Sequence, residues 1–516
     1  MSLLISCNLR QLSPEYRCNM ANKITKIIGR QLLRNVFHWP SQREMNAPFM
    51  RNQYYVLLIC ILLGSPRAVS AADESVESLK KQLNELSEKV RILERKLDAE
   101  GSGGGSTKAQ PGPRLTAGSD GFSFSSADTN FVLKLKGYVQ ADARFYIDDH
   151  IPGNDTFLMR RVRPYVEGTL WKYYDFRVML DFGTGTTSSS LNNGFLQDAY
   201  LNVHYIPEFQ VQVGKFKPPV GLERMQSGAN LLFAERGYPS QFTPNRDVGL
   251  QLHGQIMGGL LGYQAGVFNG VQDNASGDSD IGVDDHKDVA ARLFVHPFRK
   301  SSVKPLEGLG LGVGGSWGNQ AGTLPTYKTP GQQTFFSYVT GAGTNANVTA
   351  DGTHWRLVPQ VYYYWGPFGL LGEYAISSQT LRRDAGGGAP LFLNPHHRAW
   401  QVAGSWFVTG EQNSFAPVKP VQSFSLADGT FGALELAARY GEITLDQELF
   451  GAPGFATSSS ANKAKSWGLG ANWYLNRNVK LMLDYDQTDF RGGSTAPRQV
   501  TAQDEKVIIM RGQVAF

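Results

Sequence analysis

Basic side chains concentrate in one connecting segment of the chain, between residues 215 and 246. This segment holds five cations and only two acids. The cations are Lys215, Lys217, Arg224, Arg236 and Arg246. Arginine is suited to phosphate because its planar fork donates two hydrogen bonds to two oxygens. Cations about 4–8 Å apart raise the local anion concentration, whereas charges beyond a Debye length of about 8–10 Å do not. The segment therefore predicts an anion-binding constriction.

Two amphipathic strands must position this segment. Apolar and polar residues alternate in 209–213 and again in 247–253, as in a sheet that is wetted on one side. The connection between them is rich in Pro and Gly and is too long for a hairpin turn. It could close over the mouth of a barrel or fold into its lumen.

Strand candidates follow one another from Phe131 onward without a sustained helical period. They comprise residues 131–147, 157–170, 174–182, 195–206, 209–217, 246–258, 260–268, 287–297, 306–317, 353–366, 368–381, 396–409, 431–445, 464–476, 478–490 and 503–516. Short and long connections alternate between them, as in membrane barrels. The connection 410–430 is long although it lies on the side of the barrel where the other connections are short turns. It is therefore either a real insert or a sign that a strand was miscounted.

We therefore predict an all-β fold, a sixteen-stranded antiparallel transmembrane β-barrel over residues 131–516. A closed sheet is the form that lipid tolerates, because an open edge would leave backbone groups unpaired in hydrocarbon. The last strand ends in Phe516, as the assembly signal of outer-membrane barrels does, although an ordinary edge strand could also end there. A soluble β-sandwich or propeller is the alternative, but no blade-like repeat is visible.

Alternation turns the polar side of each strand toward the lumen, since a basic side chain facing lipid at mid-bilayer costs about 2–4 kcal/mol. The predicted lumen cations are Lys134, Lys136, Arg144, Arg161, Arg163, Arg177, Arg292, Arg356, Arg439, Lys480 and Arg511. Acids share this surface, namely Asp142, Glu167, Asp181, Glu435 and Asp484. Arg160 falls on the opposite face, which places it at the membrane interface or indicates a shifted register. The alternative role of all these charges is as solvated wall residues of a general diffusion pore.

The N-terminal part predicts export. Residues 50–71 show the charged start, short apolar run and small-residue cleavage site of a signal peptide, so 1–71 is a targeting segment. Met50 is then the expected start, with a genuinely extended signal as the alternative. Residues 1–71 hold nine of the 50 basic and two of the 45 acidic residues, so the remainder has a formal charge of −2. That charge gives no argument for nucleic-acid binding. All three cysteines also lie there, which excludes disulfides from the mature chain.

Residues 72–100 carry a heptad repeat of Leu and Val and predict a short periplasmic coiled-coil helix before the barrel. A single such helix would expose its apolar stripe, so the segment implies oligomerisation, unless it packs against the protein's own body. Residues 101–130 are rich in Gly, Ser and Pro at their start and predict a flexible linker.

Other chemistry is not indicated. His396 and His397 resemble a metal pair, but adjacent strand residues point to opposite faces. The acidic stretch 273–288 lacks the spacing of an EF-hand loop, and a solvated outer loop is the simpler interpretation. We expect no catalytic residues, no metal and no cofactor.

Several motifs resemble those of the phosphate-selective porin O and P family. They are VGKFKPPVGLER at 213–224, PNRDVG at 244–249, RRVRP at 160–164, GVFNG at 266–270, DVAARL at 288–293, GPFG at 366–369, LAARY at 436–440, NWYLN at 472–476 and RGQVAF at 511–516. The resemblance covers about residues 131–516. It implies a trimeric, sixteen-stranded outer-membrane porin with inward-folded loops and an arginine-lined path for phosphate or pyrophosphate.

The expected function is thus a passive outer-membrane channel for small anions, phosphate or pyrophosphate, through an arginine- and lysine-lined constriction. Its partners would be outer-membrane lipid and two further copies of the chain. Two alternatives stay open: a general or differently selective nutrient porin, and a structural protein whose coiled coil contacts the cell wall or a periplasmic partner.

Overall fold

The computed structural model describes residues 88–89, 112–147, 153–183, 195–277, 285–341, 347–384, 388–451, 453–492 and 504–516. The chain forms two units, Met1–Thr107 and Lys108–Phe516. Glu88 and Lys89 are helical, and the rest of the predicted targeting segment and coiled coil lies outside the described residues. Within the described parts, no helix is both long and apolar enough to cross a membrane.

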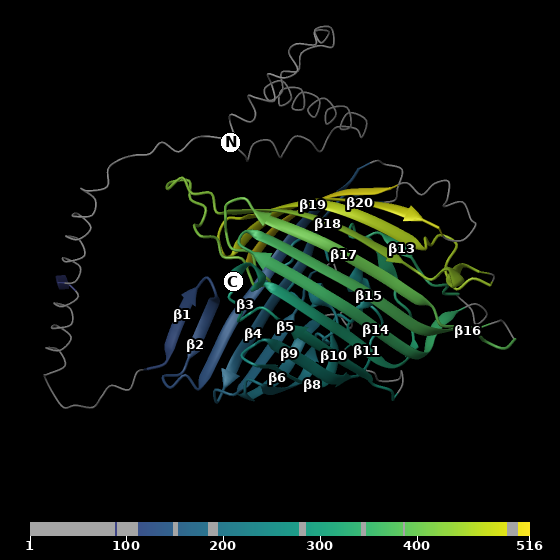
Figure 1. Cartoon of the computed structure of the whole chain (residues 1–516), viewed down its shortest axis with the longest axis horizontal. Coiled ribbons are helices and arrows are strands. Elements are labelled where there is room, and N and C mark those ends of the chain that lie inside the picture. The colour runs from purple at the N-terminus through teal and green to yellow at the C-terminus, as the bar shows by residue number, and fades with distance from the viewer. Residues whose placement is uncertain are drawn as a thin grey trace, which may run out of the picture. The chain divides into compact units, whose positions relative to one another are not determined.

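Sixteen antiparallel strands form a closed barrel in the second unit (Figure 1). They are β3 (Phe131–Tyr146), β4 (Thr156–Leu170), β5 (Tyr174–Leu180), β6 (Leu196–Ile206), β7 (Phe209–Phe216), β8 (Asp247–Ile256), β9 (Leu261–Phe268), β10 (Asp288–Val295), β11 (Leu309–Gly322), β14 (Val348–Trp365), β15 (Phe368–Arg383), β17 (His396–Phe407), β18 (Ala433–Thr444), β19 (Lys463–Tyr474), β20 (Val479–Arg491) and β21 (Glu505–Ala515). The last strand pairs with β3 and closes the barrel, with Gly512 opposite Ala141. The predicted fold and its sixteen strands are confirmed.

The predicted alternation is visible along β20. Leu481 and Leu483 point outward and are 40% and 48% exposed, whereas Met482 and Asp484 point inward and are 4% and 1% exposed. An apolar outside and a polar inside invert the pattern of a soluble protein, and they are what a membrane barrel requires. Connection 408–432 joins β17 to β18, so it is a real insert and no strand was miscounted.

The predicted linker 101–130 is wrong in its second part. Strands β1 (Arg114–Gly118) and β2 (Gly121–Ser125) form a hairpin, and β2 pairs with the first residues of β3. The hairpin extends the sheet beyond Phe516, whose backbone exchanges two hydrogen bonds with Gly137. Phe122 and Phe124 continue the apolar outer face opposite Leu135 and Leu133, which explains why this part is ordered.

Several long loops fold into the barrel and form an apolar cluster within its otherwise largely polar interior. They contain the short elements α4 (Leu222–Met225), η1 (Tyr238–Phe242), β12 (Tyr327–Lys328), β13 (Thr334–Phe336) and η3 (Gln447–Phe450). The elements β16 (Leu391–Leu393) and η2 (Lys304–Leu306) complete the fold. One core cluster joins the loop residues Tyr238, Phe242, Phe336, Leu449 and Phe455 to inward wall residues such as Phe216 and Ile443. Burial of these aromatic rings holds the loops inside the lumen.

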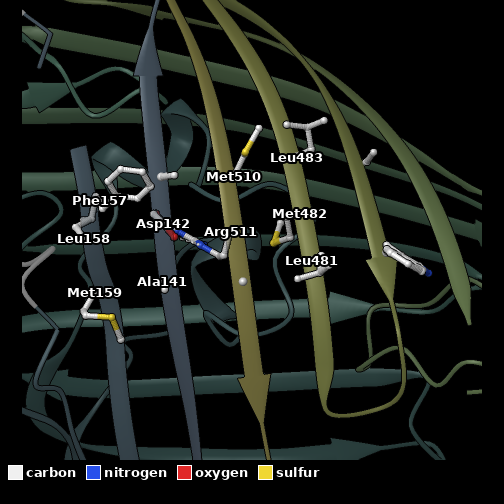
Figure 2. Close-up of a pocket in the computed structure, with 14 residues that line it drawn as sticks. Ala141, Asp142, Phe157, Leu158, Met159, Leu481, Met482, Leu483, Met510 and Arg511 are labelled. Carbon is white, nitrogen blue, oxygen red and sulfur yellow. Dashed lines mark hydrogen bonds and ion pairs between the residues drawn. The ribbon is translucent and has the colours of Figure 1, made fainter. Parts of the chain in front are cut away.

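The outer wall has an apolar concavity of about 760 Å³ across β3, β4, β19, β20 and β21. Figure 2 shows side chains such as Phe157, Met510 and Leu483 around it. It also shows Asp142 and Arg511 pointing toward each other from neighbouring strands. Arg511 donates to both carboxylate oxygens of Asp142, at 2.6 and 2.8 Å, so the closing seam of the barrel carries a bidentate ion pair.

Candidate anion site

A polar cavity of about 420 Å³ lies between the barrel wall and the inward-folded loops. Strand β4, the loop between β7 and β8, residues 272–276 and residues 325–332 contribute to its lining. Seven cations line it, namely Arg160, Arg161, Arg163, Arg224, Arg236, Arg246 and Lys328. Glu235 and Asp273 are its acids. The cavity exceeds a single water's share of liquid volume, roughly 30 Å³, more than tenfold, so it has room for a small hydrated anion.

The loop that follows β7 is anchored to the wall by two carboxylates. Glu373 of β15 accepts hydrogen bonds from the backbone N–H groups of Leu222 and Glu223, at 2.6 and 3.3 Å. The carboxylate of Glu223 in turn accepts from the N–H of Gly237 and from Gln401 Nε2, both at 2.9 Å. These bonds fix both ends of the loop's central part. They answer the question that the sequence left open, because the loop folds into the lumen.

A bulge in β4 turns two consecutive arginines inward. Gln140 of β3 pairs with Arg161, but the next β3 residue, Ala141, pairs with Met159, so Arg160 is the extra residue. A bulge adds one residue to one strand and re-aims the side chains around it. The shifted-register interpretation of Arg160 is therefore correct. Its guanidinium donates to Glu235 within the lumen.

Glu235 gathers four guanidinium groups from three strands. Its Oε1 lies 3.0 Å from Arg144 of β3 and 3.2 Å from Arg511 of β21. Its Oε2 lies 2.9 Å from Arg160 and 3.5 Å from Arg161 of β4. Burial raises the pKa of Glu235, but the surrounding arginines outweigh that effect and hold the pKa well below its usual range. The carboxylate is therefore ionised at neutral pH.

A second group of cations donates hydrogen bonds mainly to neutral oxygens. Arg224 donates to the Asn245 amide oxygen at 3.3 Å, and Arg246 donates to that same atom at 2.8 Å. The two nitrogens are thus at most about 6 Å apart, the sum of these distances. Arg236 and Lys217 share the Gln226 carbonyl oxygen in the same way, at 2.8 and 2.6 Å. The predicted spacing of cations is met in both pairs.

Burial and the close approach of these cations disfavour their charged forms, which lowers their pKa values. Burial lowers the pKa of Lys217 well below its usual range, and Arg246 and Arg236 lower it further. Burial, together with Arg236 and Arg246, does the same to the pKa of Arg224. Burial is also the main reason why the pKa of Arg236 falls to about 10. Within the described residues, Arg224 and Arg236 have no carboxylate partner within 4 Å, and Glu223 and Glu373 offset their charge only from a greater distance. An incoming anion would therefore relieve positive charge that is only partly compensated.

The predicted site residues divide into two groups. Arg161, Arg163, Arg224, Arg236 and Arg246 line the cavity. Carboxylates offset three of these, because Arg161 pairs with Glu235 at 3.5 Å, Arg163 pairs with Asp181 at 2.7 Å and Arg246 pairs with Asp198 at 3.2 Å. The sequence prediction missed Arg160 as a lining residue because a bulge cannot be read from alternation. It missed Lys328 because nothing in the sequence showed that its loop folds inward.

The remaining predicted residues lie elsewhere on the inner wall, most of them paired. Lys136 and Arg177 both bind Glu167, at 2.9 and 2.5 Å, with Lys134 on the same strand face. Arg356 binds Asp273, Arg439 binds Asp486, and Arg144 joins the Glu235 cluster. Arg292 donates to Gln360, while Lys215 is buried at the end of β7 and Lys217 donates to backbone carbonyls. Most of these wall cations are therefore paired with a carboxylate.

The histidine pair and the acidic stretch 273–288, the two other candidate sites, have structural explanations. His397 is buried, its Nε2 lies 2.9 Å from the Tyr338 hydroxyl, and its Nδ1 accepts a hydrogen bond from the Asp446 N–H. His396 is exposed on the opposite face. Asp273, from the acidic stretch, is held by Arg356 at 2.7 Å, and residues 278–284 lie outside the described residues.

Comparison with known proteins places these features in a family. Porin O of Pseudomonas aeruginosa is 24% identical over 426 residues, which cover 74% of this chain and 90% of that protein. Among solved structures, the outer membrane channel DcaP of Acinetobacter baumannii is 12% identical with a TM-score of 0.48, over 78% of this chain and 100% of that one. An anion-selective porin from Comamonas acidovorans is also 12% identical, with a TM-score of 0.43 over 75% and 100%. The family model "Phosphate-selective porin O and P" matches residues 133–516, most of the chain and all but the first two residues of its barrel, so this protein belongs to the phosphate-selective porin O and P family of outer-membrane channels.

Proposed function

We propose that this porin is a passive channel selective for small anions, phosphate or pyrophosphate, and that its selectivity arises in the arginine-lined cavity. The observation that carries the proposal is the set of hydrogen-bond acceptors that Arg224 and Arg236 contact. Both line the cavity. Arg224 donates to hydroxyl, amide and carbonyl oxygens, and Arg236 donates to backbone carbonyl oxygens. Neither donates to a carboxylate of the described residues. They can therefore exchange neutral acceptors for the charged oxygens of a permeating anion.

Transport in this proposal needs no covalent step. An anion that enters loses part of its hydration shell, and guanidinium N–H groups replace the lost hydrogen bonds. The geometry of phosphate suits this exchange, because a guanidinium fork can contact two oxygens at once. The neighbouring neutral acceptors, such as Asn245 and Asn274, can take back the N–H groups when the anion leaves. Such exchange keeps binding weak enough for release, which conduction requires.

A second candidate is a general or differently selective nutrient porin. It is supported by the carboxylates in and beside the cavity, because Asp181, Asp198 and Glu235 offset the charge of several arginines. A channel of this kind would show weak ion selectivity.

The oligomer and the periplasmic segment also belong to this proposal. The apolar outer wall and the heptad segment 72–100 support a homotrimer whose coiled coil lies in the periplasm. Contact of that coiled coil with the cell wall or a periplasmic partner is its structural alternative. Deletion of residues 73–100 separates the two roles. Intact conductance and oligomer with a weakened envelope would identify tethering as the main role of the segment.

Single-channel conductance in planar bilayers tests the selectivity. The purified protein is recorded in potassium chloride while phosphate is added at constant ionic strength. We expect phosphate to block the chloride current at low concentration, and a salt gradient to give a reversal potential that favours anions. A cation-favouring reversal potential would overturn the anion selectivity. A current indifferent to phosphate would support the general porin instead.

A further inference from the structure

Glu235 is placed where an anion would be expected. Its side chain is buried in the lining of the cavity and contacts guanidinium groups of Arg144, Arg160, Arg161 and Arg511. These arginines belong to strands of the barrel wall, whereas Glu235 belongs to the loop between β7 and β8. The loop thus delivers a carboxylate into a cluster of cations that the wall provides.

The cluster retains positive charge after Glu235 is counted. Among the described residues, Asp142 is its other acid and contacts Arg144 at 3.1 Å and Arg511 at 2.6 Å. Four guanidinium groups therefore face two carboxylates of the described residues. The buried Nε of Arg144 also has no hydrogen-bond partner among the described residues. A buried donor without an acceptor is costly, so the cluster has capacity for more anionic oxygens than Glu235 supplies.

We propose that Glu235 is a specificity-determining residue: its carboxylate occupies an anion subsite formed by Arg144, Arg160, Arg161 and Arg511, and it thereby limits the cavity to one small oxyanion. The inference rests on the proposed function and refines its ligand. A single phosphate binds at Arg224 and Arg236, which have no carboxylate partner within 4 Å among the described residues. A ligand with two phosphoryl groups, such as pyrophosphate, also needs the second subsite, where Glu235 repels it.

The decisive variant is Glu235→Gln, which keeps the shape of the side chain and removes its charge. We compare the concentrations of phosphate and of pyrophosphate that halve the chloride current, at constant ionic strength and pH. The wild type is expected to bind phosphate at least as tightly as pyrophosphate. In the variant, the preference should move toward pyrophosphate by about tenfold, which corresponds to about 1.4 kcal/mol.

Asp273→Asn is the matched control. Asp273 is also an acid of the cavity lining, but Arg356 holds it at 2.7 Å, outside the four-arginine cluster. It should leave the ratio of the two blocking concentrations within about twofold, since a twofold ratio corresponds to only about 0.4 kcal/mol. An equal gain in both variants would overturn the subsite, because a general change of potential would then explain it.

A second variant keeps the inference testable if Glu235→Gln does not assemble, which heat-modifiable migration in gels would reveal. Arg160→Gln removes a cation whose guanidinium Glu235 already holds. Because Arg160 then no longer offsets the charge of Glu235, pyrophosphate block should weaken more than phosphate block, and the preference should move further toward phosphate by about threefold, or about 0.7 kcal/mol. A preference that stays unchanged or moves toward pyrophosphate would overturn the assignment.

The two proposals fail in different ways. A wild-type current that is indifferent to phosphate overturns the proposed function. A current that phosphate blocks, combined with an unchanged preference in an assembled Glu235→Gln channel, overturns only the role of Glu235.

Discussion

Neutralising Arg236 should weaken phosphate binding strongly while leaving the barrel intact. Its Nε and Nη2 donate to the carbonyl oxygens of Glu223 and Gln226, at 3.1 and 2.8 Å, so a shorter amide at this position leaves ordinary loop carbonyls behind. No ion pair of the described residues is broken by the change. Arg236→Gln therefore isolates the contribution of one charge in the cavity lining.

The expected magnitude follows from the hydrogen bonds that the guanidinium would make to phosphate. A hydrogen bond to a charged group contributes about 1.5–3 kcal/mol. Each 1.4 kcal/mol is a factor of about ten in affinity, so the half-blocking phosphate concentration should rise roughly 10- to 100-fold. The assay is the chloride current of single channels during a phosphate titration at constant ionic strength.

Arg292→Gln is the matched control for this experiment. Arg292 is also a cation of the inner wall, but it donates to Gln360 and lies over the Phe294 ring, away from the cavity lining. Its removal should change phosphate block less than about threefold, because it acts only through the long-range potential that salt screens. Unchanged block in Arg236→Gln would refute the assignment of the cavity as the phosphate site, and equal losses in both variants would attribute selectivity to the net charge of the lumen.

Three further predictions concern pH, the interior core and the wall. Burial and the nearby Arg160 lower the pKa of Lys328, so this cation loses its proton at lower pH than a free lysine. Phosphate block should therefore weaken as the pH rises toward the ordinary lysine pKa of about 10.4, and Lys328→Arg should reduce this dependence because arginine keeps its proton to a higher pH than lysine. Phe242 is fully buried in the interior core, and Phe242→Ala should cost about 3–5 kcal/mol there, loosen the folded-in loop and raise the single-channel conductance. Gly214 has φ +122°, and a Cβ would lie 2.2 Å from the Ala199 carbonyl oxygen, so Gly214→Ala should reduce the yield of heat-modifiable barrel.

Each of these has an outcome that contradicts it. Equal pH dependence in wild type and Lys328→Arg would show that another group titrates. Unchanged conductance in Phe242→Ala would show that the loop does not depend on the interior core. Normal assembly of Gly214→Ala would mean that the paired strands β6 and β7 can move apart locally.

The sequence by itself determined the barrel. Period-two alternation depends only on neighbouring residues in one strand, so it revealed sixteen strands, their inward faces and the lipid-facing surface before any coordinates. Local composition also identified the loop of residues 215–246 as basic, and three of its five cations, Arg224, Arg236 and Arg246, line one cavity. The sequence pattern did not predict the strands within residues 112–130, because they depend on the pairing of β2 with β3, which no local pattern shows.

Only the tertiary structure determined which cations of the lumen can still bind an anion. The bulge at Arg160 depends on the register between two strands, and the inward folding of the loops depends on aromatic rings from distant segments packing together. Ion pairing is also long-range: Glu235 lies 276 residues from Arg511 in sequence, yet the two are 3.2 Å apart. Electrostatic energy depends on distance in space rather than along the chain. The number of cations can therefore be read from the sequence, but only the fold determines which of them form ion pairs with carboxylates.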